Sequence, residues 1–156
     1  MRIAFDLDDT LIPTNHRFSV GSHSLGFPLN LFFKEELRVG AVKLMKKLSQ
    51  NHEVWIYTTS LRSAFYIKAW FYFWGVKLHQ VVNNKIHNKR VANSKYSGFS
   101  KAPKIFGISV MVDDLPGVKI ECDCQNCDSI IVEPTDNLWS IKVQKEIRLI
   151  DPNHKL

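Results

Sequence analysis

The chain has 156 residues, which suits a single domain that buries its own hydrophobic core. Its content of 45% apolar and 23% charged residues is that of an ordinary soluble globular protein. No stretch approaches the roughly 18 apolar residues that a membrane span requires, and carboxylates at positions 6, 8 and 9 occupy the place of a signal peptide's apolar region. We therefore expect one domain over residues 1–156, located in the cytoplasm, with no membrane partner.

The net charge of +6 and the pI near 9.3 favour anionic partners. Residues 84–104 contain no acidic residue and carry several cations: Lys85, Lys89, Arg90, Lys95, Lys101 and Lys104, with His87. A run of this kind is typical of a solvated surface loop. The alternative is a binding surface for a phosphate-rich substrate or for nucleic acid.

The first third of the chain predicts a strand, a loop, a helix and a strand. Residues 2–5 form a short apolar run that ends in the polar run 6–10. Residues 13–28, rich in Ser, Gly, His and Asn, indicate a loop or small flap. Residues 35–49 predict an amphipathic helix. Residues 54–57 are almost wholly apolar, which suits a strand covered on both faces, as in parallel sheets.

A second helix is predicted from about Arg62 to Trp74, capped near Ser60 and stopped by Gly75. Its residues 69–74, Ala-Trp-Phe-Tyr-Phe-Trp, are apolar around most of the helix circumference. They favour burial against both the sheet and the basic loop. The alternative is an exposed aromatic patch through which the chain forms a homo-oligomer.

Further strands are predicted at 80–82, 107–112 and 129–132, and a last helix at 137–149. The alternation of strands and helices favours an α/β fold of the three-layer, Rossmann-like kind, with a mainly parallel central sheet. The chain contains no internal repeat and no linker long enough to separate two domains.

Three cysteines, Cys122, Cys124 and Cys127, fall within six residues. In a reducing compartment we expect thiols rather than disulfides. Their spacing could supply three metal ligands, with His154 as a fourth, but no second Cys or His pair stands at zinc-site spacing. We favour a loop with small side chains.

Polar clusters close three of the predicted strands: Asp6 to Thr10, Thr58 to Ser60, and Asp113 with Asp114. Ligands of open α/β sheets bind beyond the carboxyl ends of the strands, so these clusters are expected to face one crevice. Carboxylate oxygens suit Mg²⁺, and a carboxylate can accept a phosphoryl group as a nucleophile. Thr58 and a lysine ammonium would then hold the phosphate oxygens.

These clusters resemble the motifs of the haloacid dehalogenase superfamily, whose members are mostly Mg²⁺-dependent phosphatases. In chain order, the matching positions are Asp6-x-Asp8-x-Thr10, Thr58, Lys101 or Lys104, and Asp113-Asp114. We favour Lys101 over Lys104, since the following Ala-Pro fixes the backbone shortly before the next strand. The order and the strand-end context match from Arg2 to about Val132.

The resemblance implies a phosphohydrolase that works through an aspartyl-phosphate intermediate. Asp6 would attack phosphorus and bind Mg²⁺. Asp8 would act as general acid and then as general base, with its backbone carbonyl on the metal. Asp114 would be a further metal ligand, and Asp113 would bind directly or through a water.

The same resemblance implies roles for the neighbouring residues. Thr58, Thr59 and Lys101 would bind the phosphoryl group of the substrate. Thr10 would fix the loop that carries the aspartates, whereas Asp9 is expected to be a helix cap or a solvent residue.

Cap insertions usually set specificity in this superfamily, and residues 13–34 and 61–100 are too short for a large cap domain. An open site would admit a phosphorylated small molecule or a macromolecule, and the sequence does not name which. The alternative function is a non-catalytic or regulatory module of the same fold, which binds nucleic acid or another polyanion through the basic 84–104 loop.

Overall fold

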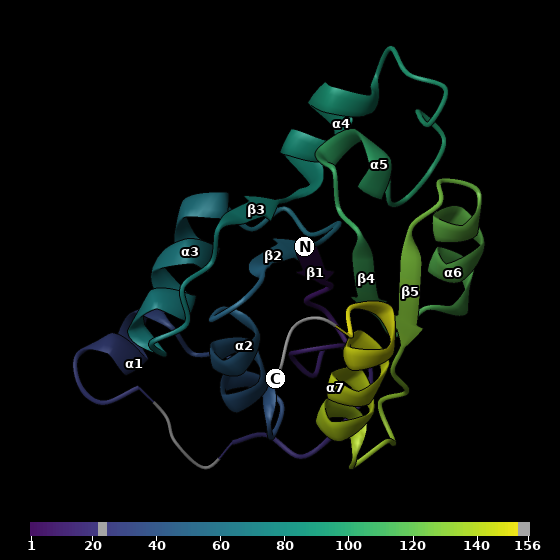
Figure 1. The fold of residues 1–156 in the computed structure, drawn as a ribbon. Helices are drawn as coiled ribbons and strands as arrows, with labels where there is room; N and C mark the ends of the chain where they lie inside the picture. The colour runs from purple at the N-terminus through teal and green to yellow at the C-terminus, as the bar shows by residue number, and fades with distance from the viewer. Residues whose placement is uncertain (22–24, 153–156) are drawn as a thin grey trace.

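Five parallel strands form one sheet in the computed structural model, which describes residues 1–21 and 25–152. The strands are β1 (Arg2–Phe5), β2 (Glu53–Tyr57), β3 (Gln80–Val82), β4 (Val110–Asp113) and β5 (Asp128–Ile131). Their order across the sheet is β3-β2-β1-β4-β5, so β1 lies at the centre (Figure 1). The expected α/β class with a parallel sheet is confirmed, and all four strand pairings are parallel.

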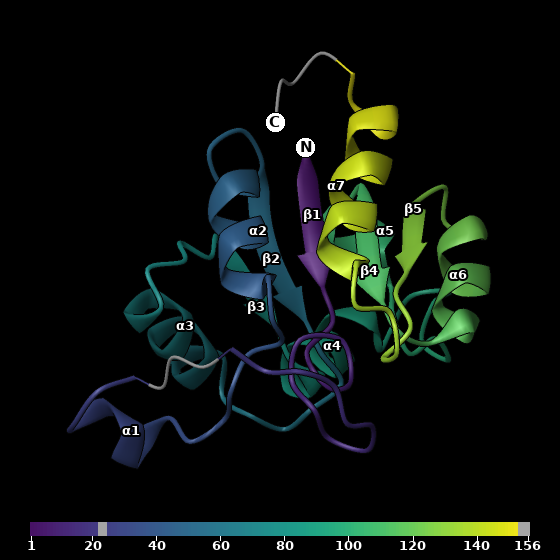
Figure 2. The same ribbon diagram turned by 90° about the horizontal axis from the view of Figure 1, so that it is seen from below.

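Helices cover both faces of this sheet and complete three layers (Figure 2). One face carries α2 (Ala41–Leu48), α3 (Ala64–Phe73) and α7 (Trp139–Ile150). The other face carries α4 (Asn84–Val91), α5 (Pro103–Phe106) and α6 (Pro116–Asp123), and the short α1 (Leu29–Phe32) buries no residue. None of the helices in the described part of the chain is long and apolar enough to cross a membrane.

Side-chain alternation along β1 and β2 builds two hydrophobic cores. Phe5 and Ile56 pack in the cluster that includes the buried side chains of α2, α3 and α7. Ala4 and Tyr57 point to the opposite face and pack with α5 and α6. Because both faces are covered, the short strands are almost wholly apolar, as the sequence indicated.

The segments that could have held a cap form only small elements. In the described residues, the segment between β1 and α2 contains one short helix, α1. The segment 61–100 is used for α3, β3 and α4, which belong to the layers of the domain. No large cap domain is therefore present in the described part of the chain, as expected.

The helix predicted from residue 35 begins only at Ala41. Arg38 is held in extended backbone by an isolated bridge to Val20, and its N–H donates to the Leu11 carbonyl at 2.7 Å. Gly40, with φ of +87°, then turns the chain into α2. The amphipathic pattern placed the helix start too early, because Leu37 is buried although it lies outside the helix.

The aromatic helix α3 begins one turn later than its predicted cap. Ser63, rather than Ser60, accepts the Tyr66 N–H at 3.0 Å, and Gly75 ends the helix with φ of +72°, as predicted. Trp70 and Phe71 are fully buried in the core shared with α2, so the expected packing against the basic segment is wrong. Other aromatic side chains of α3 are exposed, among them Phe65 and Tyr72.

The basic segment 84–104 is not the loop that its composition indicated. Its first eight residues form α4, because the Asn83 side chain caps the helix by accepting the Ile86 N–H at 3.0 Å. Pro103 then opens α5 and Gly107, with φ of +64°, closes it, so β4 starts at Val110 instead of residue 107. Proline at the first turn and glycine after the last are the signals that could have revealed α5.

The loop predicted for the cysteines holds for Cys124 and Cys127, which lie between α6 and β5, but not for Cys122, which is helical. Cys122 is buried in α6, Cys124 is exposed at its C-terminal end, and Cys127 is buried before β5; all three are free thiols. A hydrogen bond with Cys127 and burial raise the pKa of the Cys122 thiol, which opposes metal binding. His154 lies outside the described residues. Pro116 and the i, i+4 pair Val118 and Cys122 were the overlooked signs of α6.

Candidate active site

The three polar clusters converge at the carboxyl edge of the sheet. In the register of the central strands, Phe5 lies beside Ile56 of β2 and Val112 of β4. Asp6, the first residue after β1, therefore lies beside the ends of β2 and β4, and its N–H donates to the Val112 carbonyl at 2.8 Å. Figure 2 shows the strand arrows running toward the segment that follows β1.

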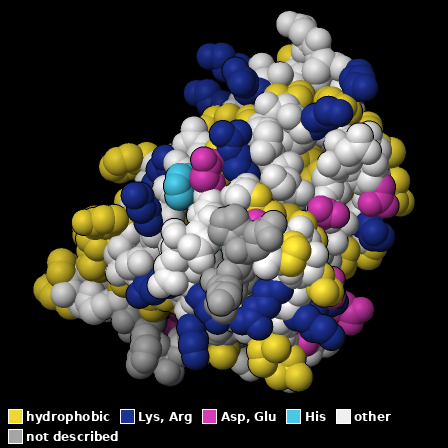
Figure 3. Space-filling model, in the orientation of Figure 1, with side chains coloured by type: hydrophobic (Ala, Val, Ile, Leu, Met, Phe, Trp, Pro, Cys, Tyr) yellow, Lys and Arg dark blue, Asp and Glu magenta, His cyan; other side chains and the backbone are white. Residues whose placement is uncertain are grey.

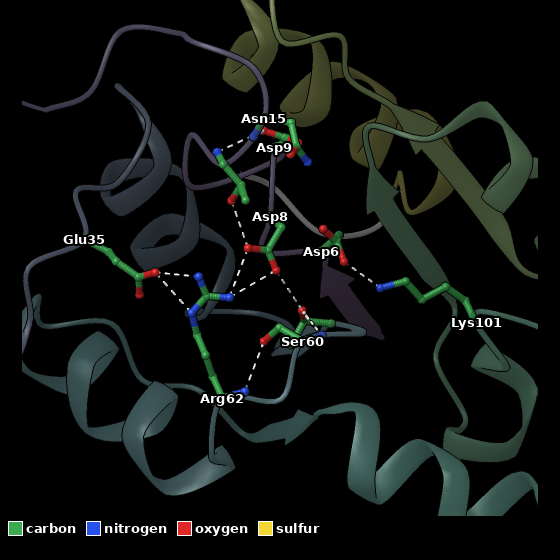
Figure 4. Close-up of polar contacts among 10 residues, drawn as sticks. Asp6, Asp8, Asp9, Asn15, Glu35, Ser60, Arg62 and Lys101 are labelled. Atoms are coloured by element: carbon green, nitrogen blue, oxygen red, sulfur yellow. Dashed lines mark hydrogen bonds and ion pairs between the residues drawn. The ribbon is translucent and has the colours of Figure 1, made fainter.

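Lys101 joins this edge from the segment before α5. Its ammonium lies 2.5 Å from Asp6 Oδ1 (Figure 4). It also donates to the Tyr57 carbonyl at 2.5 Å. It also lies 3.8 Å from Asp113 Oδ2. The side chain of Lys101 is 3% exposed, whereas Lys104 is exposed and three residues further along. The structure thus brings Lys101, and not Lys104, to the strand ends.

Asp6 and Asp113 are buried carboxylates with raised pKa values, because Lys101 offsets only part of the effect of burial and of the neighbouring carboxylates. Burial raises the pKa of Asp6 to about 6, against the lowering effect of Lys101, and Asp114 and Asp8 raise it further. Burial and the neighbouring Asp6 raise the pKa of Asp113 to about 7. Asp113 Oδ2 accepts no hydrogen bond in the structure. A cation at this position would stabilise both carboxylates.

The residues at this edge match the Mg²⁺ that the motifs imply in chemistry but not in arrangement. The donor chemistry fits, because Mg²⁺ prefers carboxylate oxygens and Asp113 Oδ2 is buried without a hydrogen bond. The side chains are not gathered around a common point: in residues 1–21 and 25–152, no group of three His, Cys, Asp or Glu is arranged as metal ligands. The Mg²⁺ site stays a prediction.

Asp8 points away from Asp6 toward an arginine that the sequence did not single out. Arg62 Nη1 lies 3.0 and 3.2 Å from the two carboxylate oxygens of Asp8, and its Nη2 lies 2.5 Å from Glu35 Oε1 (Figure 4). Thr14 Oγ1 donates to Asp8 Oδ1 at 2.9 Å. The side chains of Asp8, Arg62 and Glu35 are 26–31% exposed, so they form the open side of the site. No pattern distinguishes Arg62 from the other arginines of the chain.

Thr58, the residue after β2, contacts Asp8. Its side chain is buried, and Oγ1 accepts the Ser60 N–H at 3.0 Å and donates to Asp8 Oδ2 at 3.4 Å. Thr59, expected to help bind substrate, is exposed. Carboxylates, a hydroxyl and an ammonium therefore lie at one strand edge.

The loop after β1 is held by two side chains. Thr10 Oγ1 donates to Asp114 Oδ1 at 3.0 Å, an interaction that joins the first and last polar clusters. Asp9 is neither a helix cap nor solvent-exposed: it is 5% exposed and accepts the backbone N–H groups of Thr14, Asn15 and His16. Burial opposes ionisation of Asp9, but these hydrogen bonds lower its pKa to about 2.

Behind Lys101 lies a buried polar pair that sequence reasoning missed. The Tyr57 ring lies 5.0 Å from the Lys101 ammonium, and its hydroxyl accepts the Ala102 N–H at 2.8 Å. The same hydroxyl lies 2.5 Å from Nδ1 of His87, which is buried in α4. His87 had been grouped with the basic surface residues, because a sequence does not show which face of a short helix packs inward.

The fold and the site define an α/β protein with an acidic, lysine-containing site at the carboxyl edge of a parallel sheet. Neither a protein-family model nor a curated protein sequence matches the chain. Among solved structures, the chain is similar to a predicted HAD-like family hydrolase from Porphyromonas gingivalis. The two are 12% identical, with a TM-score of 0.49 over 96% of this chain and 97% of that chain. We infer neither activity nor substrate from a likeness of this degree.

Proposed function

We propose that the protein is a phosphohydrolase that transfers a phosphoryl group from a phosphorylated substrate to Asp6 and then to water. The observation that supports this most is the buried contact between Lys101 and Asp6, beside Thr58 and Asp8 at the same strand edge. It joins residues that are 95 positions apart and match separate motifs of the haloacid dehalogenase superfamily.

In the first step, an Asp6 carboxylate oxygen attacks phosphorus, and the bond from phosphorus to the leaving oxygen breaks. Asp8 lies on the open side of Asp6, where it would give a proton to that oxygen. In the second step, Asp8 takes a proton from water, the water oxygen bonds to phosphorus, and the Asp6–phosphorus bond breaks. Thr58 and Lys101 would hold the phosphoryl oxygens through both steps.

Mg²⁺ would be held by Asp6, Asp113, Asp114 and the Asp8 carbonyl, and it would neutralise the repulsion between phosphate and carboxylates. Arg62 and Glu35 fix the Asp8 carboxylate at the open side. The absence of a large cap in the described residues leaves this side accessible to a small phosphorylated molecule or to a macromolecule.

The test is hydrolysis of a generic aryl phosphate with and without Mg²⁺, using Asp6→Asn as the blank. Asp128→Asn is a matched control, since it makes the same chemical change on an exposed residue of β5. We expect the unmodified protein to hydrolyse the aryl phosphate in the presence of Mg²⁺ and to stop when EDTA is added. Asp6→Asn should abolish this turnover, and Asp128→Asn should retain it. Equal rates in the unmodified protein and in Asp6→Asn, across several divalent metals, would refute the proposal.

The alternative, a non-catalytic module, is favoured by the exposed cations of α4, which belong to a segment, residues 84–104, that contains no acidic residue. That function predicts anion binding without turnover. The same Asp6→Asn comparison separates the two, because binding through α4 does not need Asp6.

A further inference from the structure

A hollow of about 730 Å³ opens between α4 and α5, on the face of the sheet that these helices cover. Buried Val82 and Phe106 form part of its lining, together with three partly buried apolar side chains: Trp55 of β2, Ile86 of α4 and Ile105 of α5. The three partly buried residues are those that pack against the second hydrophobic core. That core is therefore incompletely covered at the hollow, and a flat apolar group placed there would be stabilised by removing this surface from water.

The rim of the hollow is cationic. Arg90 and Lys104 are both exposed, and neither side chain makes a hydrogen bond or ion pair with another described residue. A third cation, Arg2, is already fixed: it pairs with Glu53 at 2.8 Å, donates to the Phe106 carbonyl and lies over the Trp55 ring. Two unpaired positive charges thus stand beside an apolar floor, which suits an anion attached to a flat ring.

The positive charge continues from the rim along α4. Ile86 and Arg90 stand one helical turn apart and both line the hollow. Lys85 and Lys89, also one turn apart, form the adjacent row on the solvent side, and both are exposed. Figure 3 shows Lys and Arg side chains around hydrophobic ones at the top of the molecule, where Figure 1 places α4 and α5. A row of cations suits a chain of regularly spaced negative charges better than a single anion.

We propose that this hollow binds single-stranded nucleic acid. One base packs against Ile86, Ile105 and the part of Trp55 that Arg2 leaves uncovered, and the flanking phosphates contact Arg90 and Lys104. The strand then continues over Lys85 and Lys89. Bases supply a flat apolar face and a phosphate on the same unit, a combination that an acidic peptide lacks. The inference does not rest on phosphohydrolase activity, since no residue of the catalytic edge takes part.

The test is binding of a fluorescently labelled 12-nucleotide single strand by anisotropy, performed in the Asp6→Asn background so that no turnover interferes. The double variant Arg90→Ala/Lys104→Ala should bind at least about 10-fold more weakly, and its salt slope should fall by roughly 1.4 because two phosphate contacts are lost. The matched control is Lys43→Ala/Lys145→Ala, which removes the same charge from exposed positions on the opposite helical layer. It should bind within about 2-fold of the unmodified protein.

A second arm tests the base itself and needs no variant. A strand of the same length without bases should bind about 5-fold or more weakly, because base contacts are lost while the phosphates remain. Equal affinity for the strands with and without bases would overturn the proposed base site. Equal losses in the two double variants, or equally tight binding of a poly-glutamate peptide, would overturn the nucleic-acid assignment. Phosphatase activity is measured separately, so its absence leaves this result unaffected.

Discussion

The ammonium of Lys101 contacts Asp6 at 2.5 Å and approaches Asp113 to 3.8 Å while almost wholly buried. Removing one partner of a buried ion pair leaves the other charge without compensation, which is far more costly than losing a surface pair. The same ammonium is the group proposed to hold the transferring phosphoryl oxygens. Stability and activity are therefore linked at this residue.

Lys101→Ala is expected to lower aryl phosphate turnover by about 100-fold or more. It is also expected to lower the free energy of unfolding by on the order of 3 kcal/mol, measured by urea denaturation. Lys104→Ala, an exposed lysine of the same segment, should lose less of both quantities. The opposite order of the two variants would move the active-site assignment to Lys104.

His87 is a buried histidine whose Nδ1 contacts the Tyr57 hydroxyl. Burial lowers the pKa of His87 below its ordinary value of 6.5, so the folded state holds it neutral while the unfolded chain protonates readily. Its contribution to stability is thus fully present above about pH 6.5 and is lost as the pH falls toward the lower folded-state pKa.

We expect the melting temperature of the unmodified protein to fall between pH 7.5 and pH 5.5 more steeply than that of His87→Gln. The measurement is thermal unfolding followed by circular dichroism in both proteins, because the difference between them cancels the contributions of other groups. Parallel pH profiles would show that His87 is not the responsible group.

At the scale of elements, the start of α2 depends on Gly40. Its φ of +87° is disfavoured for residues with a Cβ, and a Cβ added there would lie 2.8 Å from Ser140 Oγ of α7. The glycine therefore serves both the helix start and the close approach of the two helices.

Gly40→Ala is expected to lower the free energy of unfolding by about 1–3 kcal/mol, as measured in urea. Gly98→Ala is the matched control, since its added Cβ would meet nothing within 4 Å. Equal stability of the two variants would contradict the backbone argument at Gly40.

At the same scale, α4 shows why the residue composition of segment 84–104 led to the wrong prediction of a loop. Its lysines and arginine predicted a solvated loop, but Asn83 caps a helix whose inward face carries His87 and Val91. Charge composition reports solvent exposure, whereas the helix follows from its cap and from two buried positions.

At the scale of the whole molecule, the sheet order β3-β2-β1-β4-β5 places segments from distant parts of the chain around one edge. The edge is acidic and partly buried, while the α4–α5 layer carries exposed cations. The ligands proposed for the two surfaces therefore differ: a cation with phosphate at the first and a polyanion at the second.

Mg²⁺ is expected to raise the melting temperature of the whole protein by a few degrees at concentrations well above its Kd, because it would bind only the folded state. Asp113→Asn should lose most of this shift, whereas the exposed Asp128→Asn should keep it. The readout is thermal unfolding at several Mg²⁺ concentrations. A shift that is unchanged in Asp113→Asn would place the ion elsewhere.

The sequence by itself determined the strands and the residues that end them. Short apolar runs with polar closures at Asp6, Thr58 and Asp113 are local patterns, and parallel strands must end at the same edge. This was enough to predict the class of fold and the placement of Asp6, Thr58 and Asp113 at one edge of the sheet.

Only the tertiary structure decided which side chains meet there and what surrounds them. Lys101 reaches Asp6 across 95 residues, and Arg62 reaches Asp8 across 54. Contacts of such separation depend on the path of the whole chain around the sheet, and no local pattern encodes them. For the same reason, the hollow between α4 and α5 could not be predicted from the sequence, because it depends on how the two helices pack on the sheet.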